Sequence, residues 1–405
     1  MPTCRHFPAC GGCQTLDIAY PAQLLRKHEE LSRHFSAWPG LRIDPVLPSP
    51  RSEGYRHKVQ LPFGFATASV ARSAGPTVGC YAAGSHTVVD QDECLVQEPS
   101  LSRVAWAVRA WASAHRLPIY NEGKGTGWLR HLLLRRGAGT GEILLGLVAN
   151  GETIKRFDPR DLLNDLLERC EEAIGAGQEG GELVGIVLSV NTGRGNVVLG
   201  GEEITWYGRP WLRENLGPFT LTAGVSTFLQ VNPYQVPRLY DLAVAAIPQG
   251  AAVLDLYSGV GSIALWASRK AGSVLGIEEN PTAVAAATRA AADNKVSNAA
   301  FLAADVGEAL GNPEHYLDAA GLPPDAIAKA GAIIVDPPRK GLEPAVREAL
   351  AALRPERLIY VSCFPATLAR DAAAFAGAYR LSSVSPADMF PHTRHVESVA
   401  VFERA

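Results

Sequence analysis

The chain has 405 residues, 47% of them hydrophobic and 20% charged, with a formal net charge of −3 at pH 7. This is the composition of a globular protein large enough for two or three domains. No apolar run reaches the ~18 residues of a membrane-spanning helix, and the N-terminus lacks the apolar core of a secretion signal, so a cytoplasmic protein without a membrane partner is expected. The slightly acidic balance excludes a general attraction to nucleic acids, so any such site must be local.

The first predicted section, residues 1–45, contains a cysteine cluster followed by an amphipathic helix over "YPAQLLRKHEELSRHF", whose Arg and Lys residues are expected on a solvated face. Without a secretion signal, a metal or redox site explains such a cluster better than disulfides do. Four thiolates suit either zinc or an iron–sulfur cluster, and His6 leaves a Cys3His zinc site open. Cys80 and Cys170 lie outside any motif and are interpreted as structural. The expected ligands are Cys4, Cys10, Cys13 and Cys94.

The second section, residues 46–225, is predicted to be a β-rich domain. Its apolar runs are separated by Gly and Asn turns, as in "EILLGLVAN", "LVGIVLSVNTG" and "NVVLGGEEITWYG". Basic residues gather with Tyr and His in "RSEGYRHK" and "LRHLLLRR". Single-stranded RNA is bound by phosphate contacts and by stacking on aromatic or guanidinium planes, although a solvated loop and a strand edge explain the same charges. The candidate RNA contacts here are Tyr55, Arg56, Lys58, Arg130 and His131.

The third section, residues 226–405, alternates near-continuous apolar strands with helices, which predicts an α/β fold with a mostly parallel sheet covered on both faces. The terminal segment "YRLSSVSPADMFPHTRHVESVAVFERA" predicts two strands without an intervening helix, an antiparallel pair that closes the sheet. Residues 310–331 are interpreted as an insertion of unknown purpose.

Glycines directly after the first of these strands indicate a nucleotide cofactor. Gly259 and Gly261 satisfy G-x-G-x-x-A between a strand and a helix. Glu278 ends the next strand, where a carboxylate accepts hydrogen bonds from a ribose. Both a nicotinamide dinucleotide and S-adenosylmethionine (SAM) carry that ribose, so these residues leave the two cofactors open.

Two other strand ends carry residues that a dehydrogenase does not need. "IIVDPPRKG" ends in Asp336 on a stiff Asp-Pro-Pro loop, and "YVSC" ends in Cys363. Ligands of open α/β sheets bind at the carboxyl ends of the strands. An enzyme that methylates a poorly nucleophilic carbon needs such a thiol, whereas the alternative for Cys363 is a packed strand-end cysteine.

Five segments in this order resemble the SAM-dependent RNA uracil-5-methyltransferase family: "LQVNPYQ", "VLDLYSGVGSIAL", "IIVDPPRKGL", "VSCFPATLARD" and "DMFPHTRHVESV". "GYRHKVQL", "VGCYAAGSHTVVDQDEC" and "GWLRHLLLRRG" are similar to segments of its central domain, so the resemblance covers nearly the whole chain. It implies a class I, Rossmann-like SAM methyltransferase domain over 226–405, a central RNA-binding domain, and methylation of uracil C5 in 23S rRNA or in the T-loop of tRNA.

The resemblance also implies roles for single residues. Cys363 is the expected nucleophile for uracil C6, and Glu397 is the expected base for the C5 proton. Arg339 and Lys340 suit a polyanion. For Asp305 a helix N-cap is an equal alternative. The implied cofactor contacts are Gln230, Tyr257, Gly259, Gly261, Ser262, Glu278, Asp305 and Asp336.

Members that act on rRNA carry this cysteine spacing with a distant fourth Cys and bind a [4Fe–4S] cluster, which favours 23S rRNA over tRNA and the cluster over zinc. Many relatives have an N-terminal OB-like TRAM domain, whereas this chain begins at the cysteine cluster, so RNA affinity is expected from the central domain. Two alternatives of other classes are an NAD(P)-dependent oxidoreductase and a non-catalytic iron–sulfur RNA-binding protein. A monomer is favoured.

Overall fold

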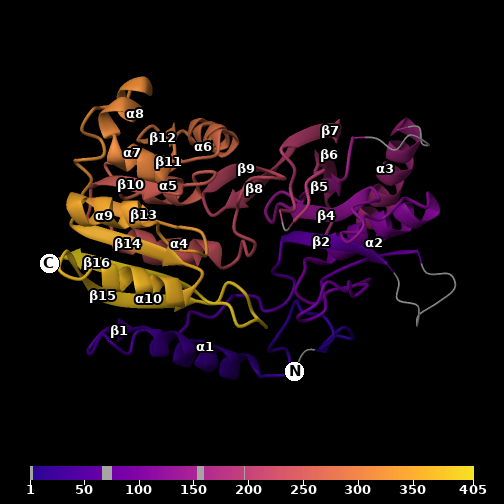
Figure 1. Ribbon diagram of the computed structural model, residues 1–405, viewed down its shortest axis with the longest axis horizontal. Coiled ribbons are helices and arrows are strands. Elements are labelled where there is room, and N and C mark those ends of the chain that lie inside the picture. Colours follow the sequence, from indigo (N-terminus) through magenta and orange to yellow (C-terminus); the bar gives the residue numbers. More distant parts are fainter. Residues whose placement is uncertain (1–2, 66–74, 153–158, 196) are drawn as a thin grey trace. The chain divides into compact units, whose positions relative to one another are not determined.

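The computed structural model describes residues 3–65, 75–152, 159–195 and 197–405, and the chain divides into two compact units (Figure 1). One, which we call the β-sheet unit, comprises residues 1–17, 51–215 and 223–226. The other, which we call the α/β unit, comprises residues 18–50, 216–222 and 227–405. These limits differ from the expected boundaries at 45 and 225, because the helix after the cysteine cluster belongs to the α/β unit.

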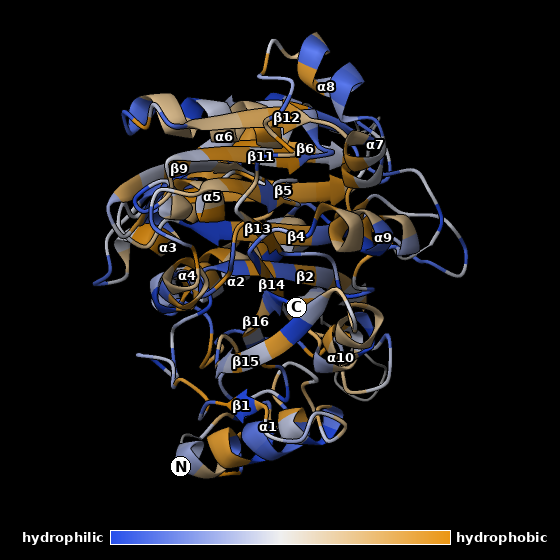
Figure 2. Ribbon diagram, turned by 90° about the vertical axis from the view of Figure 1, so that its left-hand side faces the viewer, coloured by the Kyte–Doolittle hydropathy of each residue, from blue (hydrophilic) through white to orange (hydrophobic). Residues whose placement is uncertain are grey.

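The α/β unit contains an eight-stranded sheet in the order β1-β15-β16-β14-β13-β10-β11-β12. The strands from β12 to β14 are parallel, and β16 runs antiparallel between β14 and β15. The predicted mostly parallel sheet with a terminal antiparallel pair is thereby confirmed, and its middle strands are predominantly hydrophobic (Figure 2). The strands are β1 (Arg42–Ile43), β10 (Ala252–Leu256), β11 (Ser273–Glu278), β12 (Ala299–Ala303), β13 (Ala332–Val335), β14 (Arg357–Ser362), β15 (Tyr379–Ala387) and β16 (Glu397–Arg404).

Helices cover both faces of this sheet. On one face, α1, α7, α9 and α10 share a core with alternate strand residues such as Leu254, Ile333 and Leu358. On the other face, α4, α5 and α6 contact the strands. The segment 310–331 includes α8, which packs on the first of these cores through Leu317. The helices are α1 (Tyr20–His34), α4 (Val236–Ala245), α5 (Ser262–Ala267), α6 (Pro281–Asp293), α7 (Val306–Gly311), α8 (Pro313–Ala319), α9 (Pro344–Leu353) and α10 (Pro365–Ala374).

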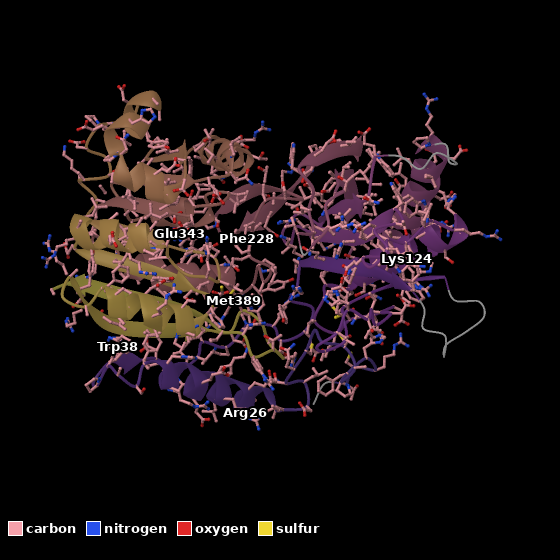
Figure 3. The ribbon with its side chains drawn as sticks, viewed as in Figure 1. Arg26, Trp38, Lys124, Phe228, Glu343 and Met389 are labelled. Carbon is pink, nitrogen blue, oxygen red and sulfur yellow. The ribbon has the colours of Figure 1, made fainter. Side chains whose placement is uncertain are left out.

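Helix α1 does not bury the purely apolar stripe that its sequence predicts. Gln23, Lys27 and Leu31 form its buried face, whereas Leu25 is 65% exposed. Lys27, expected on the solvated face, is only 3% exposed, while its neighbour Arg26 does point outward (Figure 3). The ammonium of Lys27 is buried because the carboxylate of Asp388 accepts a hydrogen bond from it at 2.6 Å.

The β-sheet unit contains a six-stranded, largely antiparallel sheet in the order β3-β2-β4-β5-β6-β7, in which only β5 and β6 pair in parallel. The β-rich domain predicted over this part of the chain is confirmed as a second sheet. A separate two-stranded sheet, β8–β9, follows. The strands are β2 (Lys58–Phe65), β3 (Pro76–Val78), β4 (Leu129–Arg136), β5 (Glu142–Ala149), β6 (Glu182–Val190), β7 (Glu202–Gly208), β8 (Trp211–Leu216) and β9 (Phe219–Gly224).

Two helices, α2 (Pro99–Ala114) and α3 (Pro159–Gly175), pack on one face of the six-stranded sheet. Their apolar residues form one core with Val59, Leu61 and Phe63 of β2, so the side chains between these on β2 point to the opposite face. Within the described parts of the chain, no helix has the length and apolarity needed to span a membrane.

Candidate active site

Several strand ends meet at one edge of the α/β sheet. The parallel strands β10, β11, β13 and β14 present their carboxyl ends there. Strand β16 runs in the opposite direction, with Ser398 opposite Ser362, so its first residue lies at the same edge. The sheet therefore gathers side chains from distant parts of the sequence, namely Tyr257, Glu278, Asp336, Cys363 and Glu397.

Cys363 follows the last residue of β14 and lies among charged groups. Burial is the main cause that raises the pKa of its thiol to about 11, and the carboxylates of Glu397 and Asp336 act in the same direction. Arg339 opposes them through its charge and through a hydrogen bond to the sulfur. The Cys363 residue is half-buried, so its thiol remains reachable from solvent. The free protein thus stores Cys363 in its protonated form.

Two of the carboxyl groups at this edge are shielded from water, Glu397 almost completely and Asp336 in part. Glu397 is 3% exposed, and within the described part of the chain its Oε2 atom has no hydrogen-bond partner. Burial first, and then the charge of Asp336, raise the pKa of Glu397 well above its usual value. Burial raises the pKa of Asp336 to about 7. Carboxyl groups shifted towards neutral pH are suited to accept a proton and pass it on.

The pKa of Cys363 gives a first testable prediction. Alkylation of this thiol by iodoacetamide in the free protein should accelerate about tenfold per pH unit and reach no plateau below about pH 10, because only the thiolate reacts. Glu397→Gln should shift the profile to lower pH, since it removes a negative charge that disfavours the thiolate. Peptide-resolved mass spectrometry separates Cys363 from the other cysteines. A plateau near pH 7 would contradict the prediction.

The glycine loop after β10 turns sharply. Tyr257, Gly259 and Gly261 all have positive φ angles, of 64°, 54° and 78°. At Gly261 a Cβ atom would come within 2.8 Å of Ala287 and Phe301, so α6 and β12 can approach the loop only because that residue is glycine. Ser262 begins α5, and its hydroxyl group is hydrogen-bonded to that of Tyr240 at 2.8 Å.

The predicted cofactor contacts lie around this loop. Glu278 accepts hydrogen bonds from the backbone N–H groups of Gly259 and Asn280, at 3.0 and 2.9 Å, so it fixes the loop. Asp305 is the N-cap of α7, the alternative role expected for it, and its carboxylate accepts a hydrogen bond from the Glu308 N–H at 2.9 Å. Gln230 is half-buried ahead of α4. These residues suit a ligand with a ribose and a cationic sulfonium. The carboxylates can accept hydrogen bonds from the ribose and attract the cation, and the glycines let the backbone approach the ligand closely.

Asp371, which the sequence analysis did not single out, anchors the loop that follows Asp336. Its buried carboxylate accepts hydrogen bonds from the Leu342 N–H, the Tyr360 hydroxyl and the Arg347 guanidinium, at 2.9, 2.9 and 3.0 Å. The side chain is 0% exposed. A carboxylate this deep requires such partners. They fix both the Asp-Pro-Pro-Arg-Lys loop and β14, and thereby position Arg339 and Cys363.

A second missed set of residues holds the segment before β16. Lys27 of α1 binds Asp388 and donates to the carbonyl of Phe390 at 3.0 Å. Gln23 accepts from the His392 N–H at 2.9 Å. Asn232, two residues after Gln230, donates to the Met389 carbonyl at 3.1 Å. Helix α1 and the glutamine segment therefore fix the loop that leads to Glu397.

The comparisons with known proteins agree with this geometry. Residues 223–405 match the family model described as tRNA (Uracil-5-)-methyltransferase. An uncharacterized RNA methyltransferase of Leptospira interrogans is 36% identical over 402 residues, which cover 99% of this chain and 98% of the relative. One of Bacillus cereus is 34% identical over 404 residues, 98% of this chain and 82% of the relative. The crystal structure of Pyrococcus abyssi tRNA (uracil-54, C5)-methyltransferase in complex with S-adenosyl-L-homocysteine aligns with a TM-score of 0.74 and 27% identity over 98% of this chain and 86% of that chain.

The chain belongs to the RNA uracil-5-methyltransferase family. Its α/β unit has the SAM methyltransferase fold, so the cofactor is SAM and not the nicotinamide dinucleotide that the glycine pattern also allows. The family's activity is the SAM-dependent methylation of uracil C5 in RNA.

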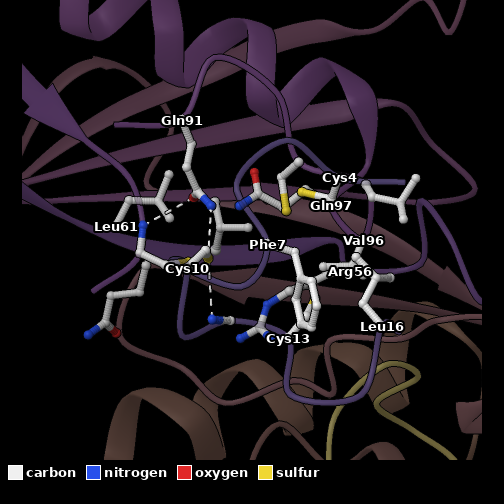
Figure 4. A pocket seen from close by; sticks show the side chains of 16 residues that line it. Cys4, Phe7, Cys10, Cys13, Leu16, Arg56, Leu61, Gln91, Val96 and Gln97 are labelled. Carbon is white, nitrogen blue, oxygen red and sulfur yellow. Dashed lines mark hydrogen bonds between the residues drawn. The ribbon is translucent and has the colours of Figure 1, made fainter. Parts of the chain in front are cut away.

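In this methyltransferase, five cysteines line one cavity of the β-sheet unit, with a volume of about 150 Å³ (Figure 4). Cys10 accepts hydrogen bonds from the Gly12 N–H at 3.3 Å and from Gln91 Nε2 at 3.1 Å. A hydrogen bond from Cys80 is the main cause that lowers the pKa of Cys10 to about 6. Burial raises the pKa of Cys13 to about 12. The five cysteines are the four expected ones, Cys4, Cys10, Cys13 and Cys94, together with Cys80.

Cys80, which was expected to be structural, lies beside Cys10 and lines the same cavity. The signal that could have found it is its place in "VGCYAAGSHTVVDQDEC", the segment that also carries Cys94. His6 pairs with Asp92 at 3.3 Å and does not line the cavity. Among the residues that the structure describes, no group of three or more His, Cys, Asp or Glu side chains is arranged to hold a metal ion. The donor type nevertheless suits a metal centre with thiolate ligands.

The candidate RNA contacts of the methyltransferase have different surroundings. Tyr55 is fully buried, and Arg130 is 5% exposed, donating to the carbonyls of Asn191 and Gly193 at 2.6 and 2.8 Å. These two side chains stabilise the interior, and we do not propose them as RNA contacts. Arg56 lines the cysteine cavity, and burial lowers the pKa of Lys58 to about 7. Lys340 is exposed and pairs with Glu343, while Arg339 contacts His395 at 3.0 Å and hydrogen-bonds the sulfur of Cys363.

Proposed function

We propose that this protein transfers a methyl group from SAM to C5 of a uridine in 23S rRNA through a covalent bond between Cys363 and C6 of the uracil. The observation that carries the proposal is the grouping of Cys363, Glu397, Asp336 and Arg339 at one edge of the α/β sheet. The family supplies the reaction, and the cysteine cavity supports the choice of rRNA, because rRNA-acting members carry this spacing.

The residues of this edge fit the successive steps. The thiolate of Cys363 forms a bond to C6, which turns the ring into an enolate with a nucleophilic C5. SAM, when bound, supplies an electrophilic methyl group, and Gln230, Glu278, Asp305 and Asp336 with the glycine loop are the residues that would hold it. C5 would then bond to that methyl group as the bond from the methyl group to the sulfonium sulfur breaks, and S-adenosylhomocysteine would leave. Glu397 removes the C5 proton, the C5–C6 double bond forms again, and the sulfur of Cys363 leaves.

Arg339 and the buried carboxyl groups adjust the first step. In the free protein, burial and two carboxyl groups keep the thiol protonated, so the reactive form must appear when substrates are bound. Arg339 is placed to stabilise the thiolate by its charge and by a hydrogen bond to the sulfur. The uridine must be unstacked to reach this edge, as in other enzymes that act on bases.

The substrate class gives the second prediction. Radioactive methyl transfer from SAM to full-length 23S rRNA should exceed transfer to a mixture of tRNAs by at least about 100-fold, and nuclease mapping should locate the label at C5 of a uridine. The runner-up is tRNA, which is the substrate of the aligned Pyrococcus abyssi methyltransferase. Labelling of tRNA alone would overturn the rRNA proposal and leave the chemistry intact.

We further propose that Cys4, Cys10, Cys13 and Cys94 bind a [4Fe–4S] cluster in the β-sheet unit. The support is the donor set, since these thiols line one cavity with apolar neighbours such as Phe7 and Leu16. The cluster would hold the N-terminal segment on the sheet; methyl transfer does not require it to change its redox state.

The third prediction distinguishes the cysteines that bind the cluster from the cysteines that do not. Protein purified without oxygen should contain about four iron atoms per chain, and Cys13→Ser or Cys94→Ser should lose the iron and the absorbance near 400 nm. Cys170→Ala is the matched control, because Cys170 is buried in α3 away from the cavity. Cys80→Ala should retain iron if Cys80 only neighbours the ligand Cys10. One zinc per chain and no iron would contradict the proposal.

A further inference from the structure

The β-sheet unit has a second cavity that none of the steps above uses. It has a volume of about 490 Å³ and is more open than the cysteine cavity. Volumes of 300–1,000 Å³ are typical of sites for small ligands and cofactors. Six of its lining side chains carry the argument below: Gln60, Pro62, Tyr81, His86, Glu122 and His131.

The sheet itself explains why these side chains meet. On β2, Val59, Leu61 and Phe63 enter the core beneath α2 and α3, so Gln60 and Pro62 project from the other face. Pro62 pairs with His131 on the neighbouring strand β4, which places the imidazole on the same face. This part of the face is a wall of the cavity.

Two aromatic rings form another wall. The ring centroids of Tyr81 and His86 lie 5.3 Å apart, and the ring planes make an angle of 39°. The two residues lie on either side of a turn that is closed by a hydrogen bond from the Ala82 N–H to the Thr87 carbonyl. The Gly11 N–H donates to the Tyr81 carbonyl at 2.9 Å and thereby fixes the backbone of the tyrosine. A flat ligand in this cavity would find ring faces on a rigid backbone.

The polar groups of the cavity suit a neutral ligand with both donors and acceptors. The Nδ1 atom of His131 is buried and has no hydrogen-bond partner among the residues that the structure describes. Burial lowers the pKa of His131 to about 4, so its ring is neutral and offers one donor and one acceptor. The amide of Gln60 is exposed beside it. The described lining contains the carboxylate of Glu122 and neither Lys nor Arg, which disfavours a phosphate.

We propose that this cavity binds one unpaired nucleobase of the RNA substrate, distinct from the uracil that is methylated. A nucleobase is flat and uncharged, and its edge carries the donors and acceptors that His131 and Gln60 complement, while its face stacks on Tyr81. The inference rests on the proposed function, because the family membership makes RNA the ligand. It adds a site in the β-sheet unit that recognises RNA by a base instead of by its phosphates.

The test uses the full chain carrying Cys363→Ala, so that RNA binds without reacting. The probes are a single-stranded 12-nucleotide RNA of mixed sequence and the same backbone without bases. Tyr81→Ala should weaken binding of the base-containing RNA about 5- to 100-fold and leave the abasic RNA unchanged, since stacking on a ring has this magnitude. Tyr81→Phe keeps the ring and should bind like the parent.

His131→Ala provides an independent variant. It should weaken binding of the base-containing RNA about 5- to 20-fold and leave binding of the abasic RNA unchanged. Ultraviolet cross-linking of the bound RNA should yield adducts on the peptides that contain Tyr81 or His131. Each variant is compared at equal iron content, because Cys80 and Gly12 line both cavities.

Two results would overturn the nucleobase site while the proposed function stands. In the first, Tyr81→Ala and His131→Ala bind both RNAs like the parent. In the second, they lose affinity for both RNAs equally. In either case, the corresponding variants with Cys363 intact still methylate 23S rRNA. A protein that binds neither oligonucleotide and methylates no RNA would instead refute the proposed function, and the site with it.

Discussion

Replacing Cys363 with alanine is expected to reduce methyl transfer by at least about 10⁴-fold, because uracil C5 is not nucleophilic enough to accept the methyl group until a thiolate has added to C6. The variant should still bind SAM, since the glycine loop and Glu278 are fixed by contacts that do not involve Cys363. Cys363→Ser should lose almost as much methyl transfer, because a hydroxyl group at the same position ionises far less readily than a thiol.

The mechanism is tested by trapping with 5-fluorouridine. In 23S rRNA that carries this base, fluorine replaces the C5 hydrogen, and Glu397 cannot remove it as a proton. The protein should therefore stop as a covalent adduct that survives denaturation and is absent from Cys363→Ala. Cys170→Ala is the control for a general effect of losing a thiol. Protein that binds SAM and methylates RNA but forms no adduct would refute the role of Cys363.

The alternation of strands and helices follows from the sequence because each element is marked locally. The near-continuous apolar runs, the Gly-rich turn at Gly259 and the absence of a helix between the last two strands are all visible in single segments. Parallel strands then place their ends at one edge, and reversal of the last strand adds Glu397 to it. The candidate catalytic residues could be selected this way because strand ends are where such sheets bind ligands.

The contacts that fix the loops could not be predicted, because each joins residues far apart in the chain. Lys27 looks like a solvated helix residue until Asp388, 361 positions away, is placed beside it. Arg130 sits in a basic cluster, yet its guanidinium satisfies two backbone carbonyls near Asn191. Composition and periodicity report how often a side chain is buried, whereas burial of these cations depends on a partner that only the fold supplies.

Cys363 acts in the first step of the proposed reaction and Glu397 in the last. Glu397→Gln should therefore block removal of the C5 proton without blocking the attack on C6. Attack of the Cys363 thiolate on C6 and methylation at C5 do not use Glu397 as the base, so they should still occur once in the variant. Removal of the C5 proton should slow about 10²- to 10⁴-fold. A methylated covalent adduct should accumulate with ordinary uridine RNA, visible on a denaturing gel, while Glu403→Gln near the exposed end of the same strand behaves like the parent.

The stability of Glu397→Gln distinguishes loss of the base from misfolding of the variant. Because the pKa of Glu397 is raised in the folded protein, the native state holds the proton more tightly than the unfolded chain. Native stability should therefore fall as the pH rises above the unfolded value of about 4.3, and the loss continues up to the folded pKa. Glutamine removes this penalty, so Glu397→Gln should unfold in urea at least as late as the parent at pH 8. A less stable variant with no adduct would show that Glu397 supports the fold and is not the base.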